Sequence, residues 1–61
     1  EILTPREKEI MEQLAKGNLY KEVAHDLEIS LNTLKAHCYN IYQKLHVNNK
    51  TEAINKVFGR N

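Results

Sequence analysis

The sequence predicts an all-α fold, a four-helix domain with a helix-turn-helix at its centre. Apolar residues recur at helical spacing in four separate stretches, and no stretch shows the signals of a β-strand. A capping residue, Ser30, comes immediately after the second stretch and begins the third. Two helices joined by so tight a turn must cross steeply, and this geometry is typical of the helix-turn-helix.

The size and composition favour one small domain covering residues 1–61. A chain of this length buries only about 60% of the surface that it exposes when unfolded, so no deep substrate pocket is expected. No apolar run approaches the roughly 20 residues of a membrane span, and no signal peptide is visible. The single cysteine, Cys38, fits a reducing compartment. We therefore expect a cytoplasmic domain.

The first helix has a clear start and a clear end. Thr4 can cap it, Pro5 suits its first position, and Glu7 stands where a capping box requires an acid. Glu7 also lies on the apolar stripe, so its side chain is drawn toward the core. Gly17 is suited to end the helix in a left-handed conformation. The apolar residues that follow Glu7 at helical spacing are Ile10, Met11 and Leu14.

The second and third helices form the predicted helix-turn-helix. The second covers roughly residues 20–28; its start is unclear, although Asn18 could cap it. Ser30 caps the third, which runs from about Leu31 to Leu45. The residues expected to face inward are Val23, Ala24 and Leu27 in the second helix and Leu34, Cys38, Ile41 and Leu45 in the third.

The fourth helix begins with Asn49 as its cap, and Glu52 completes a second predicted capping box. The helix carries two adjacent apolar ridges, one of which should close the core while the other contacts a partner. We expect the partner contact to involve Ala53 and Val57. The alternative is that both ridges are partly buried within the monomer. The second ridge consists of Ile54 and Phe58.

The side of the third helix opposite its core stripe is suited to reading bases. At 100° per residue, Lys35, Ala36 and Tyr39 lie opposite the stripe or flank it. Hydrogen-bond donors together with one small residue that permits close approach are what a major-groove recognition helix needs. Tyr42 lies between the two faces, and we expect its ring to pack while its hydroxyl contacts water.

Charge is divided unevenly along the chain. Residues 1–30 hold four basic and seven acidic side chains, a net charge of −3, and residues 31–61 hold five basic and one acidic, a net charge of +4. These sum to the overall +1. A basic half behind an acidic half indicates one face directed toward phosphates.

No constellation of residues favours an enzyme. Glu7 has no second acid or nucleophile on its face. His37 and Cys38 are adjacent and point apart, so they cannot hold a metal together, and His25 and His46 lack zinc-site spacing. We therefore expect no catalytic site, no cofactor and no metal.

The chain carries an ordered series of short motifs, and in this it resembles the LuxR-type DNA-binding domain. That domain is the C-terminal module of NarL/FixJ-like response regulators and of quorum-sensing receptors. The likeness covers nearly the whole chain. Several positions depart from the usual pattern: Leu19-Tyr20 replaces Ser-Asn, and His46 replaces a glycine. Cys38 stands where valine is usual, and Tyr39 stands where the residue is often small, polar or basic. The matching motifs are Leu3-Thr4-Pro5-Arg6-Glu7, Ala15-Lys16-Gly17, Lys21-Glu22-Val23-Ala24, Ile29-Ser30, Thr33-Leu34-Lys35-Ala36-His37, Asn40-Ile41, Lys44-Leu45 and Lys50-Thr51-Glu52-Ala53.

The resemblance implies that the domain binds double-stranded DNA as a homodimer through its last helix. It also implies that Thr33 and Lys35 contact backbone and bases, that Ala36 and Tyr39 tune sequence preference, and that Lys50-Thr51 meets phosphate. The expected DNA-binding residues are Lys21, Thr33, Lys35, Ala36, Tyr39, Lys44, Lys50 and Thr51.

The sequence thus favours the DNA-binding output domain of a bacterial transcription regulator. The regulator is expected to be a two-component response regulator with a receiver domain before Glu1. One alternative is the output domain of a quorum-sensing receptor, which would carry a ligand-binding sensor there. Another is a helix-turn-helix used for contact between proteins, which would show no salt-dependent affinity for DNA.

Overall fold

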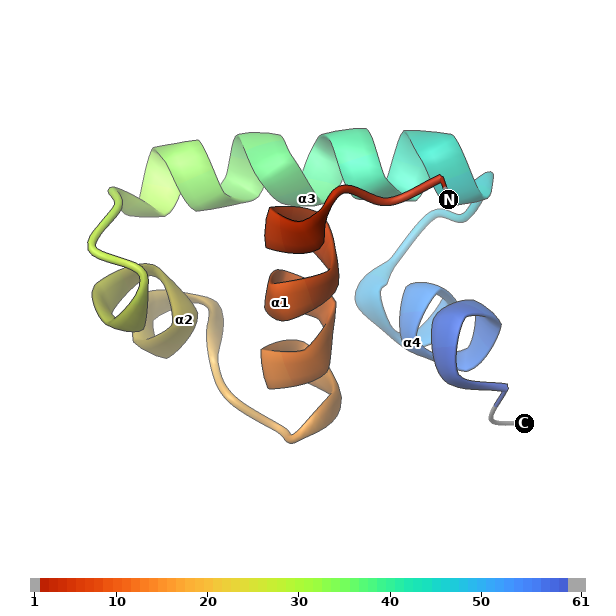
Figure 1. Cartoon of the computed structure of the whole chain (residues 1–61), viewed down its shortest axis with the longest axis horizontal. Helices are drawn as coiled ribbons and strands as arrows, with labels where there is room; N and C mark the ends of the chain where they lie inside the picture. The colour runs from red at the N-terminus through yellow and green to blue at the C-terminus, as the bar shows by residue number, and fades with distance from the viewer. Residues whose placement is uncertain (1, 60–61) are drawn as a thin grey trace.

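The computed structural model describes residues 2–59, and within them it contains four helices and no strand. In chain order these are α1 (Pro5–Ala15), α2 (Tyr20–Asp26), α3 (Leu31–Leu45) and α4 (Lys50–Phe58). Helix α3 runs along one side, α1 crosses steeply beneath its middle, and α2 and α4 lie under its two ends (Figure 1). The predicted all-α class is confirmed. No helix among the described residues is long and apolar enough to cross a membrane.

Helix α1 begins as predicted, with a complete capping box. The Glu7 amide donates to Thr4 Oγ1 at 3.2 Å, and the Thr4 amide donates to Glu7 Oε1 at 2.9 Å. The helix ends at Ala15, and two residues later Gly17 reverses the chain with a φ of 95°, in the left-handed region that favours glycine. Thr4 and Gly17 therefore fix the length of α1.

Thr4→Ala is expected to lower the free energy of unfolding by about 1 kcal/mol, because it leaves the Glu7 amide without an acceptor. For a domain of this size the melting temperature should fall by roughly 4–8 °C. Thermal denaturation of the two proteins measures this shift. An unchanged midpoint would contradict the role of Thr4 as a cap.

The turn between α2 and α3 differs from the prediction at its start. Helix α2 ends at Asp26, earlier than residue 28, because Glu28 adopts a left-handed conformation with a φ of 58°. The Ile29 amide bonds to the Ala24 carbonyl at 3.0 Å, and the Glu28 amide bonds to the His25 carbonyl at 3.1 Å. These two bonds form a Schellman motif, which reverses the chain before Ser30 begins α3.

The predicted cap of α2 is also wrong. Leu19, not Asn18, is the residue before the helix, and its side chain has no acceptor. Half of a capping box remains, because the Leu19 amide donates to Glu22 Oε1 at 2.7 Å. The Tyr20 ring then packs against the core, so tertiary packing holds the start of α2 where a full cap is missing.

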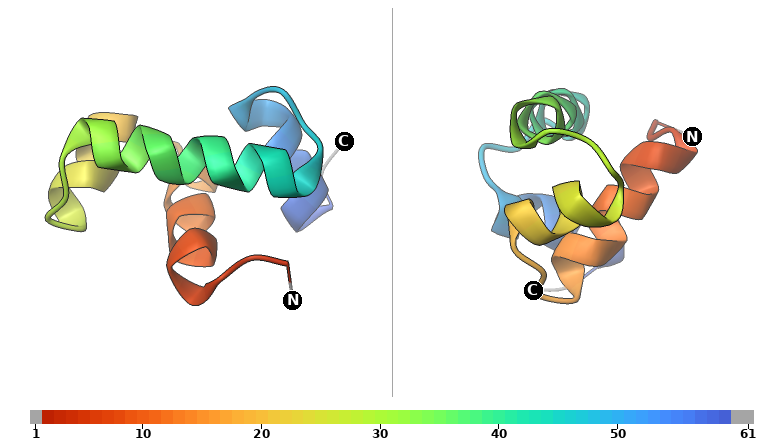
Figure 2. Two further views of the ribbon diagram at one scale, coloured as in Figure 1. Left: turned by 90° about the horizontal axis from the view of Figure 1, so that it is seen from above. Right: turned by 90° about the vertical axis from the view of Figure 1, so that its left-hand side faces the viewer.

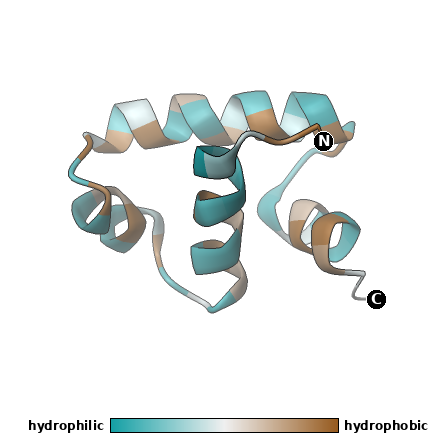
Figure 3. Ribbon diagram, in the orientation of Figure 1, coloured by the Kyte–Doolittle hydropathy of each residue, from teal (hydrophilic) through white to brown (hydrophobic). Residues whose placement is uncertain are grey.

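The core lies where the helices meet under α3. All four residues of the predicted α3 stripe are buried, and the brown side of α3 in Figure 3 faces the other helices. Burial raises the pKa of the Cys38 thiol, which therefore stays protonated at neutral pH. The buried apolar residues are Leu3, Ile10, Met11, Leu14, Val23, Ala24, Leu34, Cys38, Ile41, Leu45 and Ala53.

The structure of α4 differs from two predictions, one about its capping box and one about Ala53. Asn49 caps it, accepting from the Glu52 amide at 2.9 Å, but Glu52 accepts from the Asn48 amide and so the second capping box is shifted by one residue. Ala53 is fully buried, because its ridge packs into the core, so the prediction that it contacts a partner is wrong. Val57 is half-buried and Phe58 is exposed.

Candidate nucleic-acid interface

The outward side of α3 is the candidate recognition surface. Lys35, Ala36 and Tyr39 are all exposed, and the Tyr39 side chain projects with 64% of its surface accessible. The helix, Leu31–Leu45, contains no aspartate or glutamate. Figure 2 shows that this side of α3 is free of the other helices. It combines a cation, a small residue and an aromatic hydroxyl, the mix that base reading needs.

Thr33 lies at the start of this surface and is oriented by the cap. Its amide donates to Ser30 Oγ at 3.0 Å, and its hydroxyl accepts from the Ser30 hydroxyl at 2.9 Å. Because Thr33 accepts this bond, its own hydroxyl proton stays free to donate elsewhere. Thr33 is exposed, so a phosphate oxygen could accept that proton.

Further basic residues stand at the first turns of α2 and α4. Lys21 and Thr51 are exposed, and the Lys50 ammonium lies 5.7 Å from the centroid of the Tyr20 ring. This cation–π contact connects the Lys50 side chain at the start of α4 with the Tyr20 side chain at the start of α2. The structure therefore places Lys50 beside a residue that packs against α3.

Tyr20 and Tyr42 make a contact that the sequence analysis missed. Their hydroxyl groups are 2.8 Å apart and share a hydrogen bond across 22 residues of chain. The Tyr42 hydroxyl therefore has a protein partner that the sequence analysis did not predict. Burial raises the pKa of Tyr42, and the hydrogen bond with Tyr20 raises it further, so this hydroxyl stays protonated. The one sequence feature that could have indicated this pair is Tyr20 itself, which stands where the family pattern usually has an asparagine.

Lys44 differs from the other predicted DNA-binding lysines. Its ammonium lies 2.8 Å from Glu7 Oε1, and Glu7 is buried with 5% of its surface exposed. Burial alone would raise the pKa of Glu7, but the bond from Lys44 and the bond from the Thr4 amide reverse this effect, so the pKa is lowered. Lys44 thus links α3 to the start of α1.

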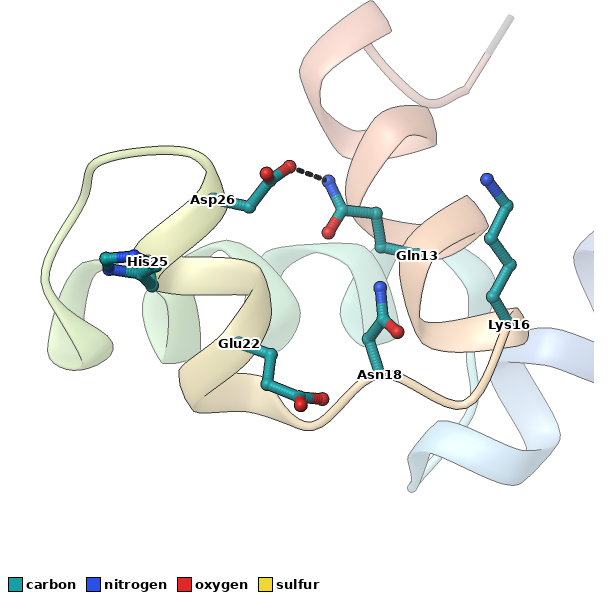
Figure 4. Close-up of a pocket in the computed structure, with 6 residues that line it drawn as sticks. All are labelled: Gln13, Lys16, Asn18, Glu22, His25 and Asp26. Carbon is teal, nitrogen blue, oxygen red and sulfur yellow. Dashed lines mark hydrogen bonds between the residues drawn. The ribbon is translucent and has the colours of Figure 1, made fainter.

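Another hollow with polar lining lies elsewhere, between the end of α1 and α2 (Figure 4). Gln13 and Asp26 point toward one another there and form a 2.9 Å hydrogen bond. The carboxylates of Glu22 and Asp26 make this hollow unsuited to phosphate. Among the described residues no group of three or more His, Cys, Asp or Glu side chains could hold a metal. The hollow is lined by Gln13, Lys16, Asn18, Glu22, His25 and Asp26.

Comparison with known proteins identifies one family. The family model described as bacterial regulatory proteins, luxR family, matches residues 1–57. The CsgBAC operon transcriptional regulatory protein of Escherichia coli K12 is 47% identical over 53 residues, which is 87% of this chain and 24% of that protein. The response regulator protein VraR of Staphylococcus aureus is 41% identical over 61 residues, all of this chain and 29% of that protein.

The monoamine regulon transcriptional regulator of Klebsiella aerogenes is 40% identical over 57 residues, 93% of this chain and 25% of that protein. The chain therefore spans about a quarter of the length of the curated relatives that it matches. No solved structure matches it significantly.

Proposed function

This chain belongs to the luxR family of bacterial regulatory proteins, and we propose that its α3 reads the major groove of double-stranded DNA. The observation that carries this proposal is the division of α3 into two sides. One side closes the core through Leu34, Cys38 and Ile41, while the other presents Lys35 and Tyr39 without any acidic neighbour on the helix. Lys35, Ala36 and Tyr39 would contact base edges.

Phosphate contacts come from the residues around this surface. The Thr33 hydroxyl keeps a proton to donate, and the basic groups of Lys21 and Lys50 stand at the first turns of α2 and α4. Thr51 follows Lys50 and is exposed. Lys44 contributes chiefly by holding Glu7, since its ammonium is already paired. Such contacts position a protein on DNA without carrying sequence information.

Salt dependence tests this arrangement. Each cation that neutralises a phosphate contributes about −0.9 to the slope of log K against log salt concentration. Lys50→Ala is therefore expected to flatten the slope by about one unit and to weaken binding to all duplexes alike. Fluorescence titration of labelled duplex at several salt concentrations measures this.

Lys16→Ala is the matched control, because it removes the same charge at the far end of α1 from α3 (Figure 1). An equal flattening in both variants would contradict a specific phosphate contact by Lys50. Absence of any salt-dependent affinity in the parent chain would instead favour a helix-turn-helix used for contact between proteins.

We propose further that the domain is the output domain of a response regulator. The similarity to VraR over all 61 residues supports this assignment. The residues that precede Glu1 in the full-length protein test it. A receiver domain with a phosphate-accepting aspartate would support the proposal, whereas a ligand-binding sensor domain would favour a quorum-sensing receptor.

The proposed homodimer contact is the last turn of α4, where Val57 is half-buried and Phe58 is exposed. A patch from one short helix falls well below the roughly 1,200 Å² of a stable interface, so dimerisation should depend on DNA. Val57→Glu is expected to lower cooperative binding to a duplex with two half-sites and to leave affinity for one half-site unchanged. Gel-shift titration of both duplexes checks this.

Because Val57 is half-buried, Phe58→Glu at the more exposed position is the second variant. Circular dichroism establishes that each variant is folded. Full cooperativity in folded Val57→Glu and Phe58→Glu would place the dimer contact elsewhere.

A further inference from the structure

A shallow groove runs beside α3, next to the outward surface that faces the bases, and it shares Lys35 and Tyr39 with that surface. Its volume is about 230 Å³, and its lining is almost entirely apolar carbon. Tyr20 at the start of α2 forms one wall, and one side of α3 forms the other. None of the lining residues is acidic; they are Tyr20, Lys35, Cys38, Tyr39 and Tyr42.

The groove lies on the flank of α3. Tyr42 follows Lys35 by seven residues, and two helical turns place both on the same side of the helix. Ala36, the residue after Lys35, lies about 100° further around the helix and faces away from the core. When a helix lies in the major groove, its flanks face the sugar–phosphate strands that border the groove. The groove is therefore placed for the DNA backbone.

The Tyr20–Tyr42 pair supplies a hydrogen-bond donor at this groove. Two phenols carry two hydroxyl protons, and the 2.8 Å bond between them uses one. Tyr42 also interacts with the buried thiol of Cys38, whereas Tyr20 lies on the side of Lys50. If Tyr42 donates to Tyr20, the remaining proton belongs to Tyr20, the residue whose ring the Lys50 ammonium contacts.

Charge around the groove is complementary to a phosphate. The Lys50 ammonium lies 5.7 Å from the centre of the Tyr20 ring, and Lys35 is one of the residues that line the groove. The apolar part of the lining suits the carbon face of a deoxyribose. A neutral hydrogen-bond donor with two cations near the groove matches one phosphate and the sugar attached to it.

We propose that this groove binds a single sugar–phosphate unit of the DNA backbone, with the Tyr20 hydroxyl donating to the phosphate and Tyr42 holding that hydroxyl in place. This inference rests on the proposed DNA-binding function. It assigns a neutral anchor to this chain, distinct from its lysines. The anchor joins α2, α3 and the start of α4 around one phosphate and so sets the position of α3 in the groove.

Removal of one hydroxyl group tests the anchor. Tyr20→Phe keeps the ring and is expected to weaken binding about tenfold on specific and random duplexes alike, because a bond to a charged phosphate is lost. The salt slope should stay unchanged, since no charge is removed. Tyr42→Phe keeps the Tyr20 hydroxyl but removes the hydrogen bond that orients it, so we expect a smaller loss of DNA affinity.

A phosphate scan identifies the partner of Tyr20. Each phosphate of the duplex is replaced in turn by an uncharged methylphosphonate, and binding is measured for the parent chain and for Tyr20→Phe. At one phosphate the replacement should lower the affinity of the parent chain, and it should lower the affinity of Tyr20→Phe about tenfold less. Phosphates elsewhere should affect the two proteins equally, which makes each duplex its own control.

Thr4→Ala controls for reduced stability, because it weakens the start of α1 and Thr4 does not line the groove. If Thr4→Ala and Tyr20→Phe lose affinity equally, the tyrosine pair is only structural and the inference is overturned. The inference is also overturned if Tyr20→Phe binds like the parent chain, or if no phosphate shows the difference. If the parent chain itself shows no salt-dependent binding, the proposed function fails as well.

Discussion

Lys44→Met is expected to lower the free energy of unfolding by about 1–3 kcal/mol, because it leaves the buried Glu7 carboxylate without its cation. For a domain of this size each kcal/mol shifts the melting temperature by roughly 4–8 °C. The Thr4 amide still bonds to Glu7 in the variant, which keeps the loss below that of a fully orphaned charge. Thermal and urea denaturation measure the effect.

The pH dependence of stability provides the control. Because the pKa of Glu7 is lowered in the folded chain, the pair stabilises fully above the unfolded pKa of about 4.3 and this contribution is lost as pH falls through the folded pKa. Lys44→Met should make this acid-induced loss shallower. Glu7→Gln keeps an acceptor for Lys44 and Thr4 and should also lose the acid dependence. Identical pH profiles in all three proteins would contradict the role of the pair.

Lys35→Ala should cost about 1–3 kcal/mol in binding to the specific site while changing affinity for random duplex far less. The reason is that Lys35 stands on the outward side of α3, where an ammonium can reach the acceptors of a guanine edge. Titrations of both duplexes at fixed salt separate the two affinities. Lys50→Ala serves as the comparison, since it should weaken both duplexes alike. Equal losses for Lys35→Ala would show that Lys35 contacts only phosphate.

Local signals predicted most of the fold. Thr4, Ser30 and Asn49 each cap a helix as expected, because capping depends on residues within one turn of the chain. The bounds of α3 agree with the prediction for the same reason, with Ser30 at its start and a left-handed His46 at its end. The exposed side of α3 follows from its periodicity alone.

Contacts between distant residues could not be predicted. Lys44 and Glu7 are 37 residues apart, and Tyr20 and Tyr42 are 22 apart, so only the assembled fold brings them together. The burial of Ala53 likewise depends on how α4 docks against α1 and α3, and helical spacing cannot choose between two adjacent ridges. The individual DNA contacts stay predictions.

The backbone conformations that bracket α3 have a consequence for how its specificity can change. Glu28, in the turn after α2, and His46, after α3, both adopt φ values of 58°. Helix α3 therefore cannot lengthen at its start without losing the Ser30 cap, or at its end without losing a Schellman bond. One inserted residue would rotate everything beyond it by about 100° and turn the reading side away from DNA. Point substitution at Lys35, Ala36 or Tyr39 leaves that frame intact. A new DNA sequence preference can therefore arise by substitution of these side chains, but not by insertion or deletion of residues within α3.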